Sequence, residues 1–232
     1  MKLLQTTLDD LVHLFFPHIC AGCGTDALGQ SVLCVECLHR LPVTNFHEYL
    51  ANPVEKMFRG RLPVRAASSL LYFSKDSLVQ RLLHQLKYRG NKPLGYTLGH
   101  MMGAVLKTAP LFSEVNLLVP LPLHIQKERK RGYNQAALMC DGLSEATGIP
   151  VCKEAVHKET YTETQTHKNR IQRWQNIKGR FALSDPGPLK QKHVLLVDDV
   201  VTTGATLEAC GCELLQGGVA TLRIATLAYA VK

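Results

Sequence analysis

Four cysteines near the N-terminus have the spacing of a metal-binding site. They form two Cys-x-x-Cys pairs that are separated by ten residues. Each pair can bend around a metal ion, and four thiolates complete a tetrahedron around Zn²⁺ with no coordination position left for a substrate. The predicted ligands of this structural zinc ion are Cys20, Cys23, Cys34 and Cys37. The alternatives are that His18 or His39 replaces one cysteine, or that the thiols are free or redox-active.

The segment "VLLVDDVVTTGATL", residues 194–207, combines two carboxylates with a loop that can bind an anion. An apolar strand runs into Asp198 and Asp199, and a helix should begin near Gly204. At the carboxyl edge of a parallel sheet, the backbone N–H groups of residues 202–205 can converge on a phosphate, with the hydroxyls of Thr203 and Thr206 as further donors. Adjacent carboxylates repel each other, but ribose hydroxyls or a divalent cation would stabilise them. The alternative is an ordinary strand–loop–helix unit with an incidental acidic pair.

Apolar patterns predict the elements that position these residues. Leu78, Leu82 and Leu86 share one face of a helix that Ser74 or Asp76 should cap. Strands are predicted at 66–73, 115–123, 192–198 and 219–229, with a short strand at 149–152, and helices at 74–88, 93–107, 134–148, 163–181 and 204–218. Because strands alternate with helices, we expect an α/β fold in which right-handed crossovers build a parallel sheet flanked by helices.

Three regions are expected along the chain: an N-terminal helix and zinc-finger module at 1–42, a linker at 43–64, and the α/β domain at 65–232. The helix, at 1–16, has an apolar stripe that should pack on the rest of the fold. The alternative is a helix on a lipid surface, which Asp9 and Asp10 disfavour because they lie in the middle of the helix.

The chain is basic, with 27 Lys and Arg against 19 Asp and Glu in 232 residues, a formal net charge of +8. This surplus favours an anionic partner, such as a phosphate, a nucleic acid or an acidic membrane surface, over a merely solvated basic surface. No apolar run approaches the roughly 20 residues of a membrane span, and the N-terminus is a poor signal peptide. We therefore expect a cytoplasmic protein without a membrane span.

The segment "VLLVDDVVTTGAT" closely resembles the loop with which type I phosphoribosyltransferases bind 5-phosphoribosyl-1-pyrophosphate (PRPP). The resemblance implies that Asp198 and Asp199 hold the ribose hydroxyls, and that Mg²⁺ accompanies PRPP. It also implies that the 5′-phosphate is wrapped by Val201, Thr202, Thr203, Gly204, Ala205 and Thr206. The fold expected for residues 65–232 is then a type I phosphoribosyltransferase-like parallel sheet flanked by helices.

Three further segments, in this order with the cysteine pairs and the acidic loop, resemble the ComF family, which includes ComFC and GntX. They are "LLHQLKYRGNKPLG" (82–95), "LVPLPLHIQKERKRGYNQAALM" (118–139) and "TETQTHKNRIQRWQNIKGRFAL" (162–183). The resemblance covers nearly the whole chain from Cys20 onward. It implies a small zinc-finger domain on a phosphoribosyltransferase-like domain, and a role in natural competence, transformation and DNA utilisation. Single-stranded DNA and competence helicase or translocation proteins are then the expected partners.

The basic segment "HIQKERKRGYN", residues 124–134, should follow a strand at the same sheet edge as the acidic pair. A mobile basic loop there would neutralise the pyrophosphate leaving group. Arg129, Arg131 and Asn134 are the predicted contributors, with Gln135 behind them. The alternative is a solvated run of charge in front of a helix.

Residues 157–181, which we call the hood, are similar to a polar segment of the same family. Four positions match, namely Thr162, Gln165, Arg173 and Asn176, but Lys158 and Thr160 stand where the family has arginines. Lysine keeps the charge and loses the bidentate geometry of arginine. A further cluster, Lys87, Tyr88 and Arg89, suits a nucleic-acid backbone and base stacking, or equally the C-terminus of an ordinary helix.

These observations lead to three hypotheses. The first is a competence or DNA-utilisation factor that binds PRPP and single-stranded DNA. The second is an active Mg²⁺-dependent phosphoribosyltransferase with an unknown nitrogen acceptor, and the third is a PRPP sensor without turnover. No base-recognition signature is evident, and residue 2 is lysine rather than the catalytic cysteine of a glutamine amidotransferase. The sequence therefore predicts the ligand and leaves catalysis open.

Overall fold

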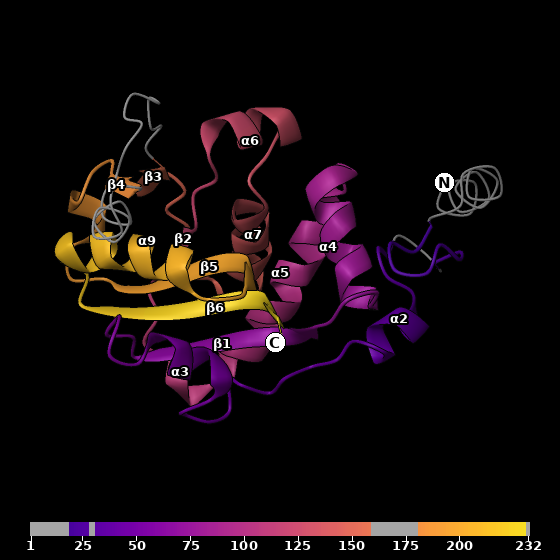
Figure 1. Cartoon of the computed structure of the whole chain (residues 1–232), viewed down its shortest axis with the longest axis horizontal. Coiled ribbons are helices and arrows are strands. Elements are labelled where there is room, and N and C mark those ends of the chain that lie inside the picture. The colour runs from indigo at the N-terminus through magenta and orange to yellow at the C-terminus, as the bar shows by residue number, and fades with distance from the viewer. Residues whose placement is uncertain (1–18, 28–30, 159–180, 231–232) are drawn as a thin grey trace, which may run out of the picture.

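The centre of the molecule is a four-stranded parallel sheet. The computed structural model describes residues 19–27, 31–158 and 181–230. The sheet has the order β1–β6–β5–β2, and every neighbouring pair of strands is parallel (Figure 1). Its strands are β1 (Ala66–Phe73), β2 (Leu117–Pro120), β5 (His193–Val201) and β6 (Thr221–Ala230). All four were predicted from the sequence.

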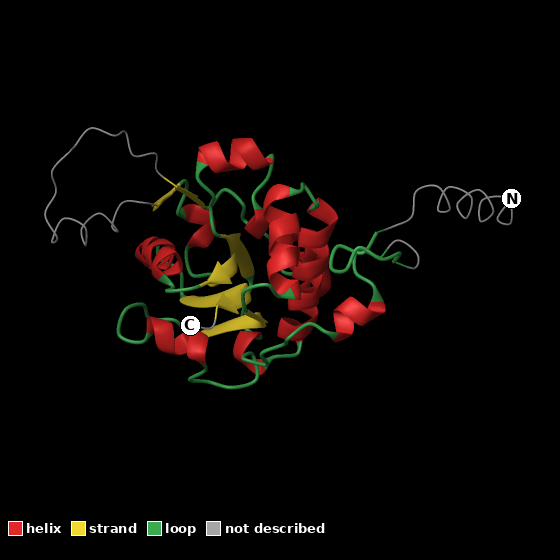
Figure 2. Cartoon of the chain, turned by 45° about the vertical axis from the view of Figure 1, so that its right-hand side comes forward, coloured by secondary structure: helices red, strands yellow, loops and turns green. Residues whose placement is uncertain are grey.

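Helices cover both faces of this sheet (Figure 2). Along β5, Leu195 and Val197 face one hydrophobic cluster, while Val194 and Leu196 face another. Because successive side chains of a strand point to opposite faces, these clusters lie on opposite sides of the sheet. The first contains α4 (Leu78–Tyr88), α5 (Lys92–Lys107) and α7 (Gln135–Thr147), and the second contains α3 (Pro53–Phe58) and α9 (Ala205–Gln216). The predicted α/β class is confirmed.

The remaining elements are short. They are the helix α2 (Val35–His39), the helix α6 (Ile125–Arg131), the 3₁₀ helices η1 (Pro110–Phe112) and η2 (Gly187–Leu189), and a separate antiparallel pair, β3 (Val156–Lys158) and β4 (Phe181–Leu183). Among the described residues, no helix combines the length and the hydrophobicity needed to cross a bilayer.

Two local predictions were wrong: the capping residue of helix α4, and the loop conformation of the basic segment 124–134. Helix α4 is capped by Ser77, whose side chain accepts from the Gln80 N–H, rather than by Ser74 or Asp76. Asp76 instead has a positive φ of 58° in the preceding turn. The basic segment is the helix α6 and not a loop, because the His124 side chain caps its start, Lys, Arg and Glu favour helix, and Gly132 ends it at φ 79°.

Residues 149–152 do not form the expected short strand, since only Val151 makes an isolated bridge, to Leu118 of β2. Strand β5 also continues beyond its predicted end at Asp198, to Val201. Both differences have one cause. Pairing with a neighbouring strand decides where a strand ends, and that partner is remote in sequence. The predicted helices at 1–16 and 163–181 lie almost entirely outside the described residues.

Residues 43–64, predicted as a linker, pack into the second hydrophobic cluster. Phe46, Val54, Phe58 and Leu62 are all buried there. Asn52 is completely buried and organises the segment: its side-chain oxygen accepts from the N–H groups of Val54 and Glu55 at the start of α3, and its amide donates to three carbonyls, one of them that of Ala67 in β1. The segment is thus held against the sheet. The domain boundaries themselves stay a prediction.

Candidate functional site

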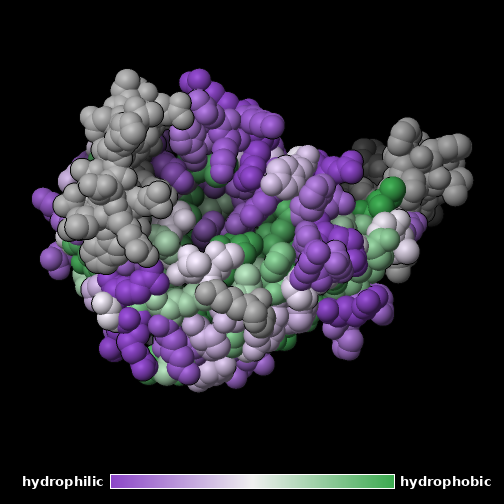
Figure 3. Space-filling model, viewed as in Figure 1, coloured by the Kyte–Doolittle hydropathy of each residue, from purple (hydrophilic) through white to green (hydrophobic). Residues whose placement is uncertain are grey.

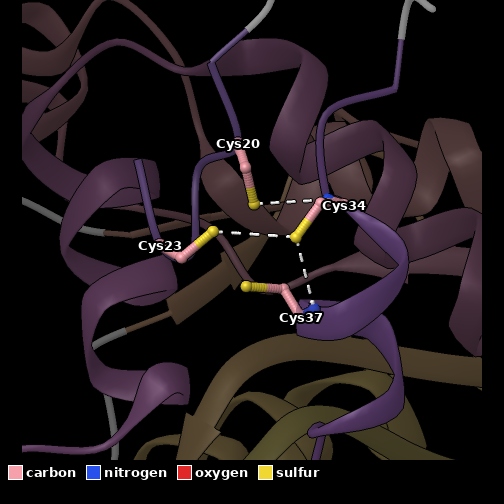
Figure 4. A group of neighbouring side chains, drawn as sticks. All are labelled: Cys20, Cys23, Cys34 and Cys37. Atoms are coloured by element: carbon pink, nitrogen blue, oxygen red, sulfur yellow. Dashed lines mark hydrogen bonds between the residues drawn. The ribbon is translucent and has the colours of Figure 1, made fainter. Parts of the chain in front are cut away.

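The four predicted zinc ligands meet in space (Figure 4). Their sulfur atoms all lie within 4.8 Å of one another. In a tetrahedral zinc site with Zn–S bonds of ~2.3 Å, the sulfurs are about 3.8 Å apart. The Cys23 and Cys34 sulfurs, 3.6 Å apart, already match that spacing. The donor set fits a structural Zn²⁺, and His39 is not part of the cluster; His18 lies outside the described residues.

Backbone groups orient these sulfurs. The N–H of Cys34 donates to the Cys20 sulfur at 3.2 Å, and the N–H of Cys37 donates to the Cys34 sulfur at 3.4 Å. A hydrogen bond from the Thr25 hydroxyl is the main cause that lowers the pKa of Cys23 to about 6. The lowered pKa favours the thiolate of Cys23, the form that binds metal. Burial, together with the neighbouring thiols, raises the pKa of Cys37.

The cysteine module packs on the first turns of α4. The carbonyl of Gly22 accepts from the Arg81 Nε at 3.1 Å. A Cβ at position 22 would lie 2.7 Å from the Cys37 sulfur and 2.8 Å from the Leu78 side chain, so only glycine fits there. The module and the sheet domain thus share one hydrophobic cluster, which includes Cys20 and Cys37.

The acidic pair, Asp198 and Asp199, lies in the C-terminal half of β5, where the strand is still paired with β6. Asp198 is opposite Thr226, and its side chain accepts from the Asp199 N–H at 2.8 Å. Loss of hydration, followed by the negative charge of Asp199, raises the pKa of Asp198 to about 8. The charges of Lys87 and Lys158 act in the opposite direction. The pair is therefore a place where hydroxyl donors or a cation would be strongly stabilising.

A lysine remote in sequence neutralises the second acid. The ammonium of Lys87, at the C-terminus of α4, lies 2.9 Å from Asp199 Oδ2, and both side chains are mostly buried. Sequence reasoning placed Lys87 in a cluster with Tyr88 and Arg89, and missed this ion pair. Arg89 instead ends α4 as its C-cap, and Tyr88 is 67% exposed. No local signal could have revealed the contact, because α4 and β5 are brought together only by the fold.

The loop after the acidic pair leads directly into helix α9. Gly204 takes a left-handed conformation, with φ 74°, and α9 begins at the next residue. Thr202, Thr203 and Thr206 are exposed, Ala205 is half-buried, and Val201 and Gly204 are buried. The N–H groups at the start of a helix have no backbone partner within the helix, so they can bind an anion. In this loop the Ala205 N–H donates to the Thr203 hydroxyl at 3.5 Å.

Helix α3 and the residues that follow it pack against this loop. The Phe58 ring occupies the space beside Gly204, where a Cβ would lie 2.9 Å from it. Arg61 donates to the Thr203 carbonyl at 3.3 Å and forms an ion pair with Glu208 of α9. These two residues were missed because the segment was treated as a linker. The signal was present: Asn52 followed by a proline is a typical helix start.

The basic residues that follow β2 lie in helix α6, which directs their side chains to different surroundings. Arg129 is exposed, whereas Arg131 is half-buried with its guanidinium 5.5 Å from the centre of the Tyr88 ring. Asn134 caps α7 by accepting from the Ala136 N–H, and its amide donates to the Leu121 carbonyl. Both ends of its side chain thus already have backbone partners. Gln135 is buried, and its amide nitrogen has no hydrogen-bond partner among the described residues.

The ends of α4 and α6 enclose a pocket of about 310 Å³, which we call the basic pocket. Its lining residues are Lys87, Tyr88, Gly90, Lys127, Lys130, Arg131 and Tyr133. Residues 127, 130 and 131 are three and four positions apart and so share one face of α6. In Figure 3 the hydrophilic surface of α6 stands above a hollow in the molecule. Arg129, which was predicted to act with Arg131, is not among the lining residues.

Within the hood, the structure describes only its two ends. Lys158 lies in β3 with its ammonium 5.4 Å from the centre of the Phe181 ring in β4. Its charge contributes to the pKa of Asp198, so β3 brings it toward the acidic pair. The positions that match the family, Thr162, Gln165, Arg173 and Asn176, and the divergent Thr160 lie outside the described residues.

Comparison with known proteins agrees with this architecture. A protein-family profile described as "Phosphoribosyl transferase domain" matches residues 119–231. The chain is 29% identical to the DNA utilization protein YhgH of Escherichia coli O157:H7, covering 89% of this chain and 88% of that protein. It is 27% identical to competence protein F of Haemophilus influenzae, over 93% of this chain and 86% of that protein. Its identity to the competence protein ComFC of Bacillus subtilis is 30%, over 90% of this chain and 77% of that protein. The chain therefore belongs to the ComF family of competence and DNA utilization proteins, and it carries a phosphoribosyltransferase domain.

Proposed function

We propose that this protein binds PRPP at the acidic pair of β5 and the loop that follows it, and that it also binds single-stranded DNA in the cytoplasm. The observation that carries the PRPP proposal is the succession of two acidic residues in β5, a loop that turns at the left-handed Gly204, and the start of α9. This arrangement supports the proposal, because the carboxyl edge of a parallel sheet is where ligands of such folds bind.

In this proposal each residue has a distinct task. Asp198 and Asp199 accept hydrogen bonds from the ribose hydroxyls, and they are also the residues that would hold the Mg²⁺ that accompanies PRPP. Such an ion would supply positive charge to the diphosphate. The N–H groups of residues 202–205, with the exposed hydroxyls of Thr203 and Thr206, bind the 5′-phosphate. The phosphate then replaces the long hydrogen bond, 3.5 Å, from the Ala205 N–H to the Thr203 hydroxyl. Arg129 and Arg131 on α6 add positive charge for the diphosphate.

The DNA part of the proposal rests on the charge of the chain and the basic pocket. A net charge of +8 favours a polyanion. Single-stranded DNA is bound by positive charges, which contact its phosphates, and by aromatic rings, on which its bases stack. The basic pocket offers both, because its cationic side chains surround the exposed Tyr88. Two relatives bear competence names and one bears a DNA utilization name, which is consistent with a nucleic-acid partner.

Calorimetric titration with PRPP and Mg²⁺ tests the first part. We expect saturable binding to the wild type, and loss of it in the double variant Asp198→Asn/Asp199→Asn. The matched control is Asp141→Asn, which removes a half-buried carboxylate of α7 that pairs with Lys153 and lies outside the proposed site. Unchanged binding in the double variant would refute the site. Release of pyrophosphate from the same samples distinguishes turnover from binding alone.

Binding of a fluorescent thymidine oligonucleotide at several salt concentrations tests the second part. Affinity should fall linearly with salt on logarithmic axes, with a slope of about −0.7 for each phosphate neutralised. The double variant Lys127→Gln/Lys130→Gln should reduce that slope by more than one unit, roughly the loss of two phosphate contacts. Absence of binding at low salt would refute the DNA part and leave the PRPP part intact.

A further inference from the structure

Lys87 belongs to two places at once. Its ammonium lies 2.9 Å from Asp199 Oδ2, and the same side chain lines the basic pocket. The exposed fractions of the two side chains, 24% for Lys87 and 12% for Asp199, show that this ion pair is largely shielded from water. One cation therefore connects the acidic pair of β5 to a cavity between α4 and α6.

The ion pair sets the charge of the pocket. Three cations of α6 face the cavity, namely Lys127, Lys130 and Arg131, but the charge of Lys87 is offset by Asp199 as long as the pair is intact. A ligand that hydrogen-bonds to Asp199, or a cation beside it, competes directly with the Lys87 ammonium. The displaced ammonium is on the flexible end of a lysine, so it can turn to the pocket without a change in the backbone.

We propose that the basic pocket binds a phosphate-bearing anion, and that Lys87 couples it to the acidic pair, so that occupation of that pair by ribose strengthens anion binding in the pocket. This proposal rests on the proposed ribose site. The coupling is reciprocal, because any ligand that attracts Lys87 into the pocket also removes the competitor of the ribose hydroxyls at Asp199.

The rest of the pocket suits phosphate next to a flat group. The guanidinium of Arg131 lies 5.5 Å from the centre of the Tyr88 ring, and the centre of the His84 ring lies 5.0 Å from it. Tyr88 as a residue is nevertheless 67% exposed, which leaves part of it accessible to a ligand. Tyr133 is fixed, since its hydroxyl donates to the Leu86 carbonyl at 2.5 Å and so ties the end of α4 to the start of α7. The ligand chemistry is a diphosphate or the phosphodiesters of a single strand.

The main experiment measures the affinity of a thymidine oligonucleotide, and separately of inorganic pyrophosphate, with and without saturating ribose 5-phosphate. We expect ribose 5-phosphate to raise the affinity of the wild type several-fold and to steepen the salt slope of the oligonucleotide by about 0.7, the value for one added phosphate contact. In Lys87→Met the ratio of the two affinities should be close to one. Lys75→Met, an exposed lysine before α4, is the matched control and should keep the wild-type ratio.

A second measurement does not need a ribose ligand. Asp199→Asn should release Lys87 and raise the affinity of the pocket for anions when no ribose ligand is present. This gain should vanish in the Lys87→Met background of a double-mutant cycle. An equal gain in both backgrounds would overturn the coupling, as would an unchanged ratio in a wild type that binds ribose 5-phosphate. If ribose 5-phosphate does not bind at all, the proposed ribose site fails, and the cycle still decides the role of Lys87.

PRPP identifies the source of the anion. If PRPP competes with the oligonucleotide while ribose 5-phosphate strengthens its binding, the pocket holds the diphosphate of PRPP itself. If both compounds strengthen binding, the pocket holds the DNA phosphodiesters. Either result supports the coupling through Lys87, whereas weaker oligonucleotide binding with ribose 5-phosphate would contradict it.

Discussion

The ring of Phe58 lies against Gly204, so close that a Cβ on this glycine would be 2.9 Å from a ring carbon. Phe58 is the last residue of helix α3, and Gly204 is the N-cap of helix α9 in the proposed phosphate loop. The contact shows that residues 53–62 do more than connect two domains, because they determine the space in which that loop turns.

The first prediction concerns Gly204→Ala. Two effects add: a left-handed φ of 74°, which costs an alanine about 1–2 kcal/mol, and the contact with Phe58. Urea unfolding should show a loss larger than that of Gly148→Ala, by about 1–3 kcal/mol for the overpacked contact. Gly148 has nearly the same φ, 78°, and no atom near its Cβ position. Equal losses in the two variants would contradict the role of Phe58.

The second prediction concerns Arg61, which joins the Thr203 carbonyl to Glu208. Arg61→Gln should weaken ribose 5-phosphate binding several-fold by loosening the loop, with a stability change within about 1 kcal/mol because an exposed ion pair contributes little. The control is Arg59→Gln, an exposed arginine two positions earlier. The exchange Arg61→Glu/Glu208→Arg should restore stability and not ligand affinity, since the bond to Thr203 is still lost.

The third prediction concerns the zinc module. Purified protein should contain about one zinc ion per chain, as four thiolates bind one tetrahedral ion. Cys34→Ser/Cys37→Ser should abolish it, and limited proteolysis should then cut the region around Cys20 to Cys37, since metal binding supplies much of the folding free energy of such small modules. Cys152→Ser, a half-buried cysteine outside the cluster, should keep the metal. Metal-free protein with an intact, protease-resistant module would contradict the assignment.

The fourth prediction concerns pH. Burial and the charge of Asp199 raise the pKa of Asp198 to about 8 in the folded protein. A carboxyl with a higher pKa in the folded state binds more protons there, so its contribution to stability is present at low pH and declines as the pH rises from about 4 to about 8. Asp198→Asn removes this decline.

The check is urea unfolding of both proteins across that range. The free energy of unfolding of Asp198→Asn, minus that of the wild type, should rise with pH up to about 8 and then stay constant. Parallel curves for the two proteins would show that Asp198 does not titrate in this way.

Local patterns were sufficient where a feature depends on neighbouring residues in the chain. The cluster of four cysteines follows from two Cys-x-x-Cys pairs, because the short loop within each pair keeps its two sulfur atoms close together. The run from β5 through Gly204 to α9 was predicted because an apolar strand, a glycine and a helical pattern stand in sequence. Helix α6 was missed because its run of charges has no apolar face to reveal a helix.

The fold class, the cluster of four cysteines, and the order of strand, acidic pair, loop and helix could all be predicted from the amino-acid sequence, because each depends on residues that are neighbours or follow one helical or strand period. Three features could be seen only in the folded protein: the ion pair of Lys87 with Asp199, the contacts of Phe58 and Arg61 with the loop, and the pocket between α4 and α6. These contacts join segments remote in the chain. They arise because a parallel sheet brings the ends of its strands and helices to one edge, and the periodicity of apolar residues within one element does not show which other element it will contact.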